Sequence, residues 1–156
     1  MRLRELYNED TIVFELQSRE KKGVIRELVG KLRQAGKISA DMEEKVFNEV
    51  MKREALGTTG IGNHGAVPHA KVENLKEMMG IFGRSSHGIN FNSLDNEQVH
   101  AVFLIVSPLH EVQLHLKALK KISELIKHEH FCRFVREAAG FPVLKDLLVE
   151  FDTVEV

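Results

Sequence analysis

Hydrophobic residues recur along this chain with two different spacings. Through residues 18–35 they return every three or four positions, the period of an amphipathic helix, and Gly36 is a typical helix stop. A second stripe of this kind runs through residues 40–56, with Ser39 as the expected N-cap. Residues 99–106 (V-H-A-V-F-L-I-V) are instead apolar at nearly every position. Such a run is typical of a central β-strand that is covered on both faces.

The remaining segments complete an alternation of strands and helices. Shorter strands are expected at residues 11–15, 65–67 and 78–84, and further helices at residues 108–127, 131–139 and 143–151. This order predicts an α/β fold, a sandwich in which helices cover both faces of a mixed central sheet. Because the sequence contains no internal repeat and no linker-like tract, we expect residues 1–156 to form a single domain.

Composition narrows the classes of function. The chain is 43% hydrophobic and 29% charged, an ordinary mixture for a soluble globular protein, and its net charge is -1, so nucleic acid is not expected as a partner. Neither a signal peptide nor an apolar run of membrane-spanning length is found, so we expect a cytoplasmic protein without membrane insertion. The single cysteine, Cys132, excludes an intrachain disulfide and is expected to be a small buried hydrophobic residue rather than a nucleophile.

A glycine-rich stretch, G-T-T-G-I-G-N-H-G-A-V-P-H-A-K, occupies residues 57–71. Gly60, Gly62 and Gly65 allow positive φ angles and close backbone approach, as a loop around an anion or a partner surface requires. Pro68 fixes its own φ angle and restricts the residue before it. We therefore expect His69 to be presented from a stiff, shaped loop.

Eight histidines raise the question of a metal site. The string H-E-V-Q-L-H, from His110 to His115, resembles a zinc-binding helix, but its histidines are five residues apart and would lie about 140° apart around a helix. No cysteine cluster or suitably spaced carboxylate is present, so no metal and no other cofactor is expected. The other histidines are expected to have structural roles. His64 and His87 should be solvated in loops, and His100 should be half-buried in its strand. His128 and His130 should lie near a helix end, in contact with terminal carbonyls or solvent.

Two histidines and one arginine form a candidate site. Arg53 is expected in the last turn of its helix, directly before the glycine-rich stretch, and His115 early in the helix that begins near Pro108. A helix N-terminus attracts anions and favours a neutral imidazole, although His115 could also simply end an apolar helix face. A nucleophilic His69, a donor at His115 and a cation at Arg53 would suit a phosphohistidine site, but spacing alone does not show that they meet.

Taken together, the motifs resemble the type-2 enzyme IIA domains of the bacterial phosphoenolpyruvate:sugar phosphotransferase system. This family includes fructose, mannitol and nitrogen-regulatory branches. The resemblance covers essentially the whole chain. It rests on Arg53-Glu54, Thr58 to Asn63, Ala66 to Ala70, Gly88 to Phe91 with Leu94-Asp95, Val102 to Leu104, Pro108, and His115 to Leu119.

The resemblance implies roles for these residues. His69 would accept a phosphoryl group from the phosphohistidine of HPr or its nitrogen-branch counterpart, and His115 and Arg53 would assist. For the mechanism we expect one ring nitrogen of His69 to attack in line while a hydrogen bond to a backbone carbonyl fixes the other. Thr58 or Thr59 is a candidate for orienting the loop. His64 departs from the pattern of relatives and could tune the charge near the site or simply be exposed.

Three functions follow as alternatives. The first is a phosphocarrier that passes phosphate to a IIB domain, as in fructose- or mannitol-type permeases. The second, favoured because the domain is free-standing, is a nitrogen-regulatory protein whose phosphorylation state switches its target proteins. The third is a metal hydrolase that uses the histidines, and the spacing of His110 and His115 argues against it.

Overall fold

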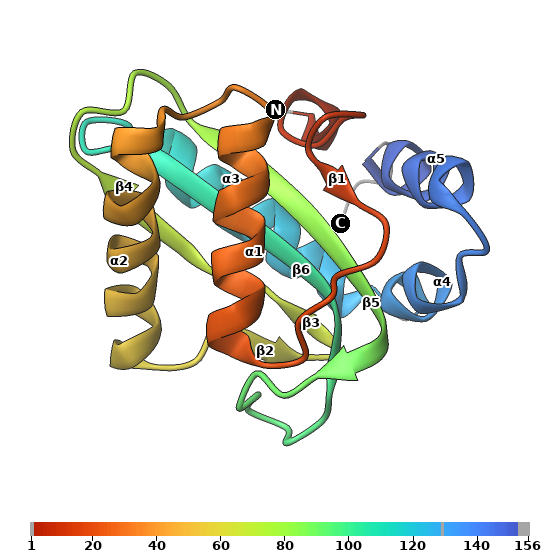
Figure 1. Ribbon diagram of the computed structural model, residues 1–156. Helices are drawn as coiled ribbons and strands as arrows, with labels where there is room; N and C mark the ends of the chain where they lie inside the picture. The colour runs from red at the N-terminus through yellow and green to blue at the C-terminus, as the bar shows by residue number, and fades with distance from the viewer. Residues whose placement is uncertain (1, 129, 153–156) are drawn as a thin grey trace.

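The computed structural model describes residues 2–128 and 130–152 (Figure 1). The short 3-10 helix η1 (Leu3–Glu5) opens this part of the chain. The five α-helices are α1 (Lys21–Gln34), α2 (Ala40–Leu56), α3 (Val112–Lys127), α4 (Phe131–Glu137) and α5 (Phe141–Asp152). The strands are β1 (Ile12–Val13), β2 (Gly60–Gly62), β3 (Gly65–Ala66), β4 (His69–Val72), β5 (Met79–Ile89) and β6 (Val99–Pro108).

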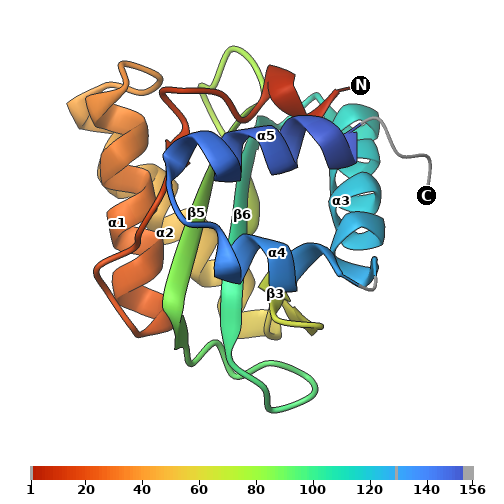
Figure 2. The same cartoon turned by 90° about the vertical axis from the view of Figure 1, so that its right-hand side faces the viewer.

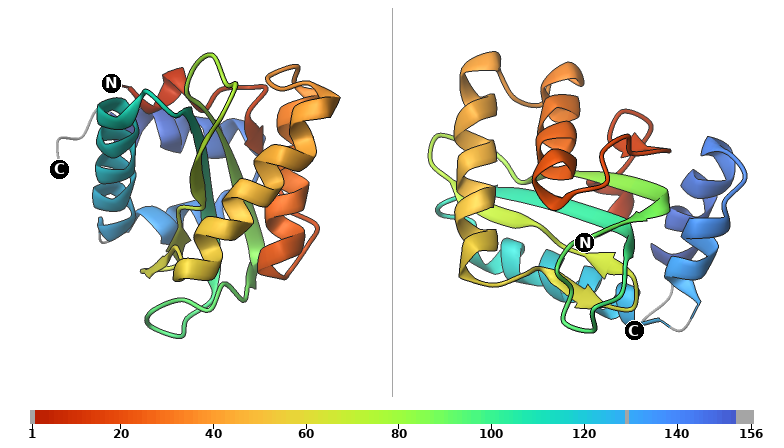
Figure 3. Two further views of the ribbon diagram at one scale, coloured as in Figure 1. Left: turned by 90° about the vertical axis from the view of Figure 1, so that its left-hand side faces the viewer. Right: turned by 60° about the horizontal axis from the view of Figure 1, so that its bottom comes forward.

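The six strands form one mixed sheet in the order β1-β5-β6-β3-β2, and β4 also pairs with β6. β5 runs antiparallel to β6, whereas β3 and β4 run parallel to it, one after the other. Helices α1 and α2 cover one face of the sheet, and α3, α4 and α5 cover the other (Figures 2 and 3). The predicted α/β fold is therefore confirmed.

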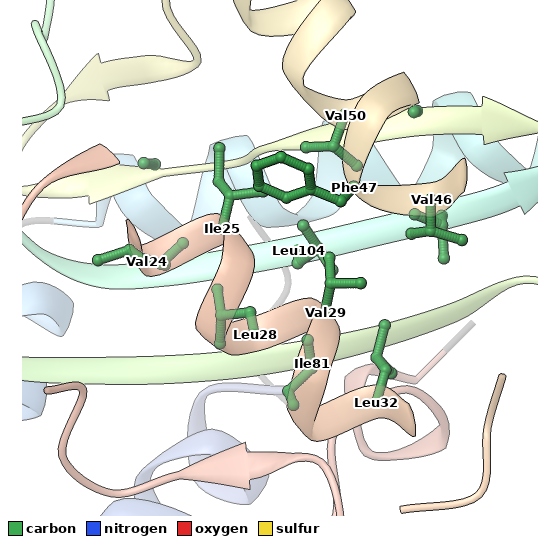
Figure 4. Close-up of a cluster of buried hydrophobic side chains, with 14 of the residues drawn as sticks. Val24, Ile25, Leu28, Val29, Leu32, Val46, Phe47, Val50, Ile81 and Leu104 are labelled. Atoms are coloured by element: carbon green, nitrogen blue, oxygen red, sulfur yellow. The ribbon is translucent and has the colours of Figure 1, made fainter. Parts of the chain in front are cut away.

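Strand β6 is the centre of the packing, since all ten of its residues are buried. Val102, Leu104 and Val106 belong to the hydrophobic cluster beneath α1 and α2, part of which Figure 4 shows. Phe103 and Ile105 point into the cluster beneath α3, α4 and α5. The continuous apolar run thus forms a strand buried on both faces, as predicted.

Strand pairing explains where the predicted boundaries were wrong. Pro108 does not begin a helix: it ends β6, where it pairs with Val72, and α3 starts only at Val112. β5 likewise continues past residue 84, across an irregularity, until Ile89 pairs with Val99. His87 is exposed as predicted, but it lies on this strand and not in a loop. In both places pairing with a neighbouring strand overrides the local turn signals: the partner is β4 at Pro108 and β6 at Ile89.

Candidate active site

His69 is the first residue of β4 and not, as predicted, a loop residue. Val67 and Pro68 lie between β3 and β4, where proline cannot donate to the β-ladder. The carbonyl oxygen of Val67 is 2.7 Å from Nδ1 of His69. Because a carbonyl only accepts hydrogen bonds, Nδ1 carries the hydrogen and Nε2 keeps its lone pair. The expected bond to a backbone carbonyl is present, so Nε2 is the ring nitrogen whose lone pair is not engaged by Val67.

His115 lies in the first turn of α3, on the side that faces the sheet, and is only 5% exposed. Its ring centroid is 5.5 Å from that of His69, at an interplanar angle of 56°. Nδ1 of His115 is 2.6 Å from the hydroxyl of the fully buried Ser107. If the serine donates to Nδ1, Nε2 of His115 carries the hydrogen and is available as a donor. The fold therefore brings together two histidines that are far apart in sequence.

Both imidazoles are held towards their neutral form. Burial lowers the pKa of His69; the bond to Val67 opposes this shift, the charge of Arg53 adds to it, and Glu54 also opposes it. Burial, with smaller contributions from the charges of His69 and Lys71, lowers the pKa of His115 to about 4. A neutral His115 was predicted from its place at a helix terminus, and in the structure burial is the first cause of its lowered pKa. A neutral His69 is the form that can attack phosphorus.

Arg53 lies in the last turn of α2, as predicted. Its Nη1 donates to the carbonyl oxygen of Gly57, 2.9 Å away, at the end of the same helix. Its charge also lowers the pKa of His69, so it contributes to the electrostatics of the site. A guanidinium has five donors, and this bond to Gly57 uses one of them.

A buried carboxylate beside Arg53 is the residue whose role sequence reasoning missed. The side chain of Glu54 is 2% exposed and forms an ion pair with Lys21, with Oε2 and Nζ 3.0 Å apart. It also accepts hydrogen bonds from the backbone N–H of Thr59, at 3.2 Å, and from the Thr59 hydroxyl. Acidic side chains are unfavourable near a helix C-terminus, so Glu54 in the last turn was a signal of a specific partner.

Both candidate threonines, Thr58 and Thr59, form hydrogen bonds at the start of the glycine-rich stretch. The hydroxyl of Thr58 donates to the carbonyl of Phe91 at 2.7 Å and accepts from the N–H of Gly60 at 3.1 Å. Thr59 is fixed by Glu54, as described above. The segment between α2 and β2 is therefore held by hydrogen bonds to Phe91 on one side and to Glu54 on the other.

The three glycines of the β2–β3 hairpin are required for different structural reasons. Only Gly62 has a positive φ angle, +100°, which the turn requires. A Cβ atom at Gly65 would lie 2.5 Å from Cγ2 of Ile126, and one at Gly60 would collide with the Ser93 hydroxyl. Of the two expected reasons for glycine, positive φ therefore applies at Gly62, and close approach of a neighbouring residue applies at Gly60 and Gly65.

The remaining histidines and the cysteine lie away from His69 and His115. His64 is partly buried, and His100, predicted to be half-buried, is only 5% exposed. His128 ends α3, with its ring 4.9 Å from that of Phe151. Burial leaves Cys132 5% exposed and raises its pKa to about 12, as expected of a hydrophobic cysteine. Within residues 2–128 and 130–152, no three His, Cys, Asp or Glu side chains are grouped to hold a metal.

Comparison with known proteins shows the family of this chain. Residues 5–149 match the family described as "Phosphoenolpyruvate-dependent sugar phosphotransferase system, EIIA 2". The chain belongs to this family. As an EIIA type-2 protein it is a phosphocarrier component of the phosphotransferase system.

Curated relatives of this EIIA protein come from two branches. It is 33% identical over 148 residues to a nitrogen regulatory protein of Bradyrhizobium diazoefficiens, a match that covers 95% of each chain. It is also 33% identical over 153 residues to the fructose-specific EIIABC component of Bacillus subtilis. There the match covers 97% of this chain but 24% of the relative, so the chain spans about a quarter of that larger protein.

Solved structures share the fold of this EIIA protein. The nitrogen regulatory protein IIA-Ntr from Neisseria meningitidis superposes with a TM-score of 0.83 at 23% identity, over 94% of this chain and 98% of the other. IIA of the Escherichia coli mannitol system, in complex with phosphorylated IIB, superposes with a TM-score of 0.76 at 17% identity, over 93% and 99%. None of the helices in the described ranges is long and apolar enough to cross a membrane.

Proposed function

We propose that this EIIA protein accepts its phosphoryl group on Nε2 of His69 and uses it as a regulatory signal. The observation that carries the acceptor assignment is the 2.7 Å contact between Nδ1 and the Val67 carbonyl, which leaves Nε2 unprotonated. The His115 ring beside it, with a centroid distance of 5.5 Å, supports a site built for phosphate.

In the transfer step, Nε2 attacks the phosphorus of a phosphohistidine on an HPr-type donor. The new N–P bond forms as the donor's N–P bond breaks, and the electron pair returns to the donor imidazole. The His69 ring becomes more positive, and the Val67 carbonyl stabilises the Nδ1–H that now carries part of this charge. Such transfers have loose transition states, so the protein contributes positioning and positive charge, here from Arg53 and a donor on His115.

The regulatory assignment rests on the extent of the match to the nitrogen regulatory relative, 95% of each chain. Phosphorylation adds about -1.5 to -2 charges, which suffices to change the affinity of a surface for target proteins. The sugar-transport alternative also has support. A fructose-specific EIIA component of Haloferax volcanii is 29% identical over 130 residues, and this match covers 83% of each chain.

The acceptor is tested by incubating the protein with phosphoenolpyruvate, enzyme I and an HPr-type carrier. Intact mass should rise by one phosphoryl group that is labile to acid and stable to base. His69→Ala should abolish the labelling, whereas His87→Ala, which removes an exposed histidine of β5, should retain it. Full labelling of the His69→Ala protein would disprove the assignment.

The recipient is tested separately with the phosphorylated protein. Rapid transfer to a fructose-type IIB domain would favour the permease function. Capture of target proteins by only one phosphorylation state, without transfer to IIB, would favour the regulatory function.

A further inference from the structure

A second polar pocket lies at the other end of α3 from His115. It has a volume of about 610 Å³ and is bordered by the β2–β3 turn, the start of β6, the end of α3 and α4. Lys127 at its rim and His115 are separated by about 18 Å along the helix at the usual rise per residue. A volume of this size is within the range of small-molecule sites, about 300–1,000 Å³. The pocket is thus separate from the phosphoryl site.

Its lining is strongly cationic. Lys127, Arg133 and Arg136 border it, and Asp95 is the acidic residue among the described residues that line it. The two oxygens of Asp95 accept hydrogen bonds from the backbone N–H groups of Asn63, at 3.2 Å, and Glu97, at 3.1 Å. Within the described ranges no ion pair joins the three cations to a carboxylate. The pocket therefore has positive charge that the described side chains do not neutralise.

Two imidazoles in the pocket, like that of His69, have Nδ1 hydrogen-bonded to a backbone carbonyl. Nδ1 of His64 lies 2.7 Å from the carbonyl of Gln98, and Nδ1 of His100 lies 2.7 Å from that of Ser85. Their ring centroids are 5.7 Å apart. Because Nδ1 donates in both rings, each Nε2 remains available to a ligand, as an acceptor when neutral and as a donor when protonated. Neither Nε2 has a hydrogen bond to another described residue.

The pKa of His100 is consistent with a positive field in the pocket. Burial is the largest cause of its lowering, and the charges of Arg136, His64 and Arg84 lower it further, against the bond to Ser85. A bound anion would offset these charges. The arrangement supplies guanidinium and ammonium groups around one concave space, and these are donors that recognise phosphate oxygens.

We propose that this pocket binds a small phosphorylated molecule. Arg133, Arg136 and Lys127 contact its phosphate. The Nε2 atoms of the two imidazoles and the carboxylate of Asp95 accept hydrogen bonds from hydroxyl groups of the ligand. The concave shape and limited volume favour a small molecule over a phosphorylated macromolecule. The proposal does not depend on the assignment of His69, because the two sites share no residue.

The test is a titration of the uniformly ¹⁵N-labelled, unphosphorylated protein with inorganic phosphate, glycerol 3-phosphate and glycerol. Both phosphate compounds should cause saturable shifts in the amides near His64, His100 and the end of α3, whereas glycerol should cause none. Shifts confined to the amides around His69 and His115 would overturn the proposal, as would equal shifts with glycerol.

A matched pair of charge reversals tests the role of the cations. Arg133→Glu with Arg136→Glu should weaken binding of glycerol 3-phosphate by about tenfold or more, since it removes two charge-assisted donors. Lys117→Glu with Lys120→Glu makes the same change in net charge at exposed positions of α3 outside the pocket and should leave the affinity nearly unchanged. All four residues are exposed, so both variants should fold. Equal weakening in the two variants would show only general charge attraction and would refute the site.

Discussion

Replacing Glu54 by Gln tests whether the buried ion pair with Lys21 stabilises the segment that precedes β2. The substitution keeps the shape of the side chain and an acceptor for the Thr59 N–H, so it removes mainly the charge. Lys21, whose side chain is 18% exposed, would then have a largely buried ammonium without its partner. Breaking a fully buried pair costs about 3–5 kcal/mol, and the partial exposure of Lys21 places the expected loss at about 3 kcal/mol.

This loss is measured by urea denaturation of the wild-type and variant proteins, with the free energy of unfolding extrapolated to water. Glu49→Gln is the control, because Glu49 belongs to the same helix but pairs with Lys52 at the surface, at 3.3 Å. Exposed pairs contribute little, so the control should lose about 0.5 kcal/mol or less. Adding Lys21→Met to Glu54→Gln should recover part of the stability by removing the unpaired charge. Equal losses for Glu54→Gln and Glu49→Gln would refute the reasoning.

Three further predictions concern the phosphoryl site. His115→Ala should leave the protein folded but slow phosphorylation by about two to three orders of magnitude, measured as the initial rate with a phosphorylated HPr-type donor; an unchanged rate would return His115 to a packing role. Arg53→Lys should also slow transfer, since an ammonium lacks the planar set of donors; a wild-type rate would restrict Arg53 to its bond with Gly57. Ring NMR should show His115 neutral down to a pH near its pKa of about 4, whereas its ordinary value is 6.5. The unfolded chain therefore binds a proton there first as pH falls, and the free energy of unfolding should decrease from about pH 6.5 towards pH 4, less so in a His115→Gln variant.

The parts of the fold that depend on strong, continuous patterns could be predicted from the sequence. The run at residues 99–106 is apolar at almost every position, and it forms the buried centre of the sheet. The helical stripes of α1 and α2 were equally clear, and Ser39 caps α2 by accepting from the N–H of Met42. Each of these features is determined by its own residues, so local reasoning was sufficient.

The parts that depend on pairing across the chain could not be predicted. β2 and β4 are short and contain glycine or polar residues, and they are strands only because β3 and β6 lie beside them. The meeting of His69 and His115 has the same origin. It requires β4 to pair with Ile105 and α3 to return over β6, and neither step is visible in the spacing of the two histidines. The contact between Glu54 and Lys21 likewise joins two helices that local patterns treat separately.

If His69 accepts the phosphoryl group, as proposed above, the pairing of β4 with β6 determines how partner proteins can recognise the phosphorylated state. The backbone of His69 is bonded to the most buried strand of the protein, since the N–H of Ile105 donates to the carbonyl of Pro68 at 3.1 Å. Moving this backbone would mean disrupting the centre of the sheet, whose amides should be among the last to exchange with solvent. Partners should therefore distinguish the two states by the charge and shape of the group on a fixed surface, and not by a rearrangement of the chain. A switch of this kind responds as fast as the phosphoryl group is transferred, because no slow conformational step intervenes.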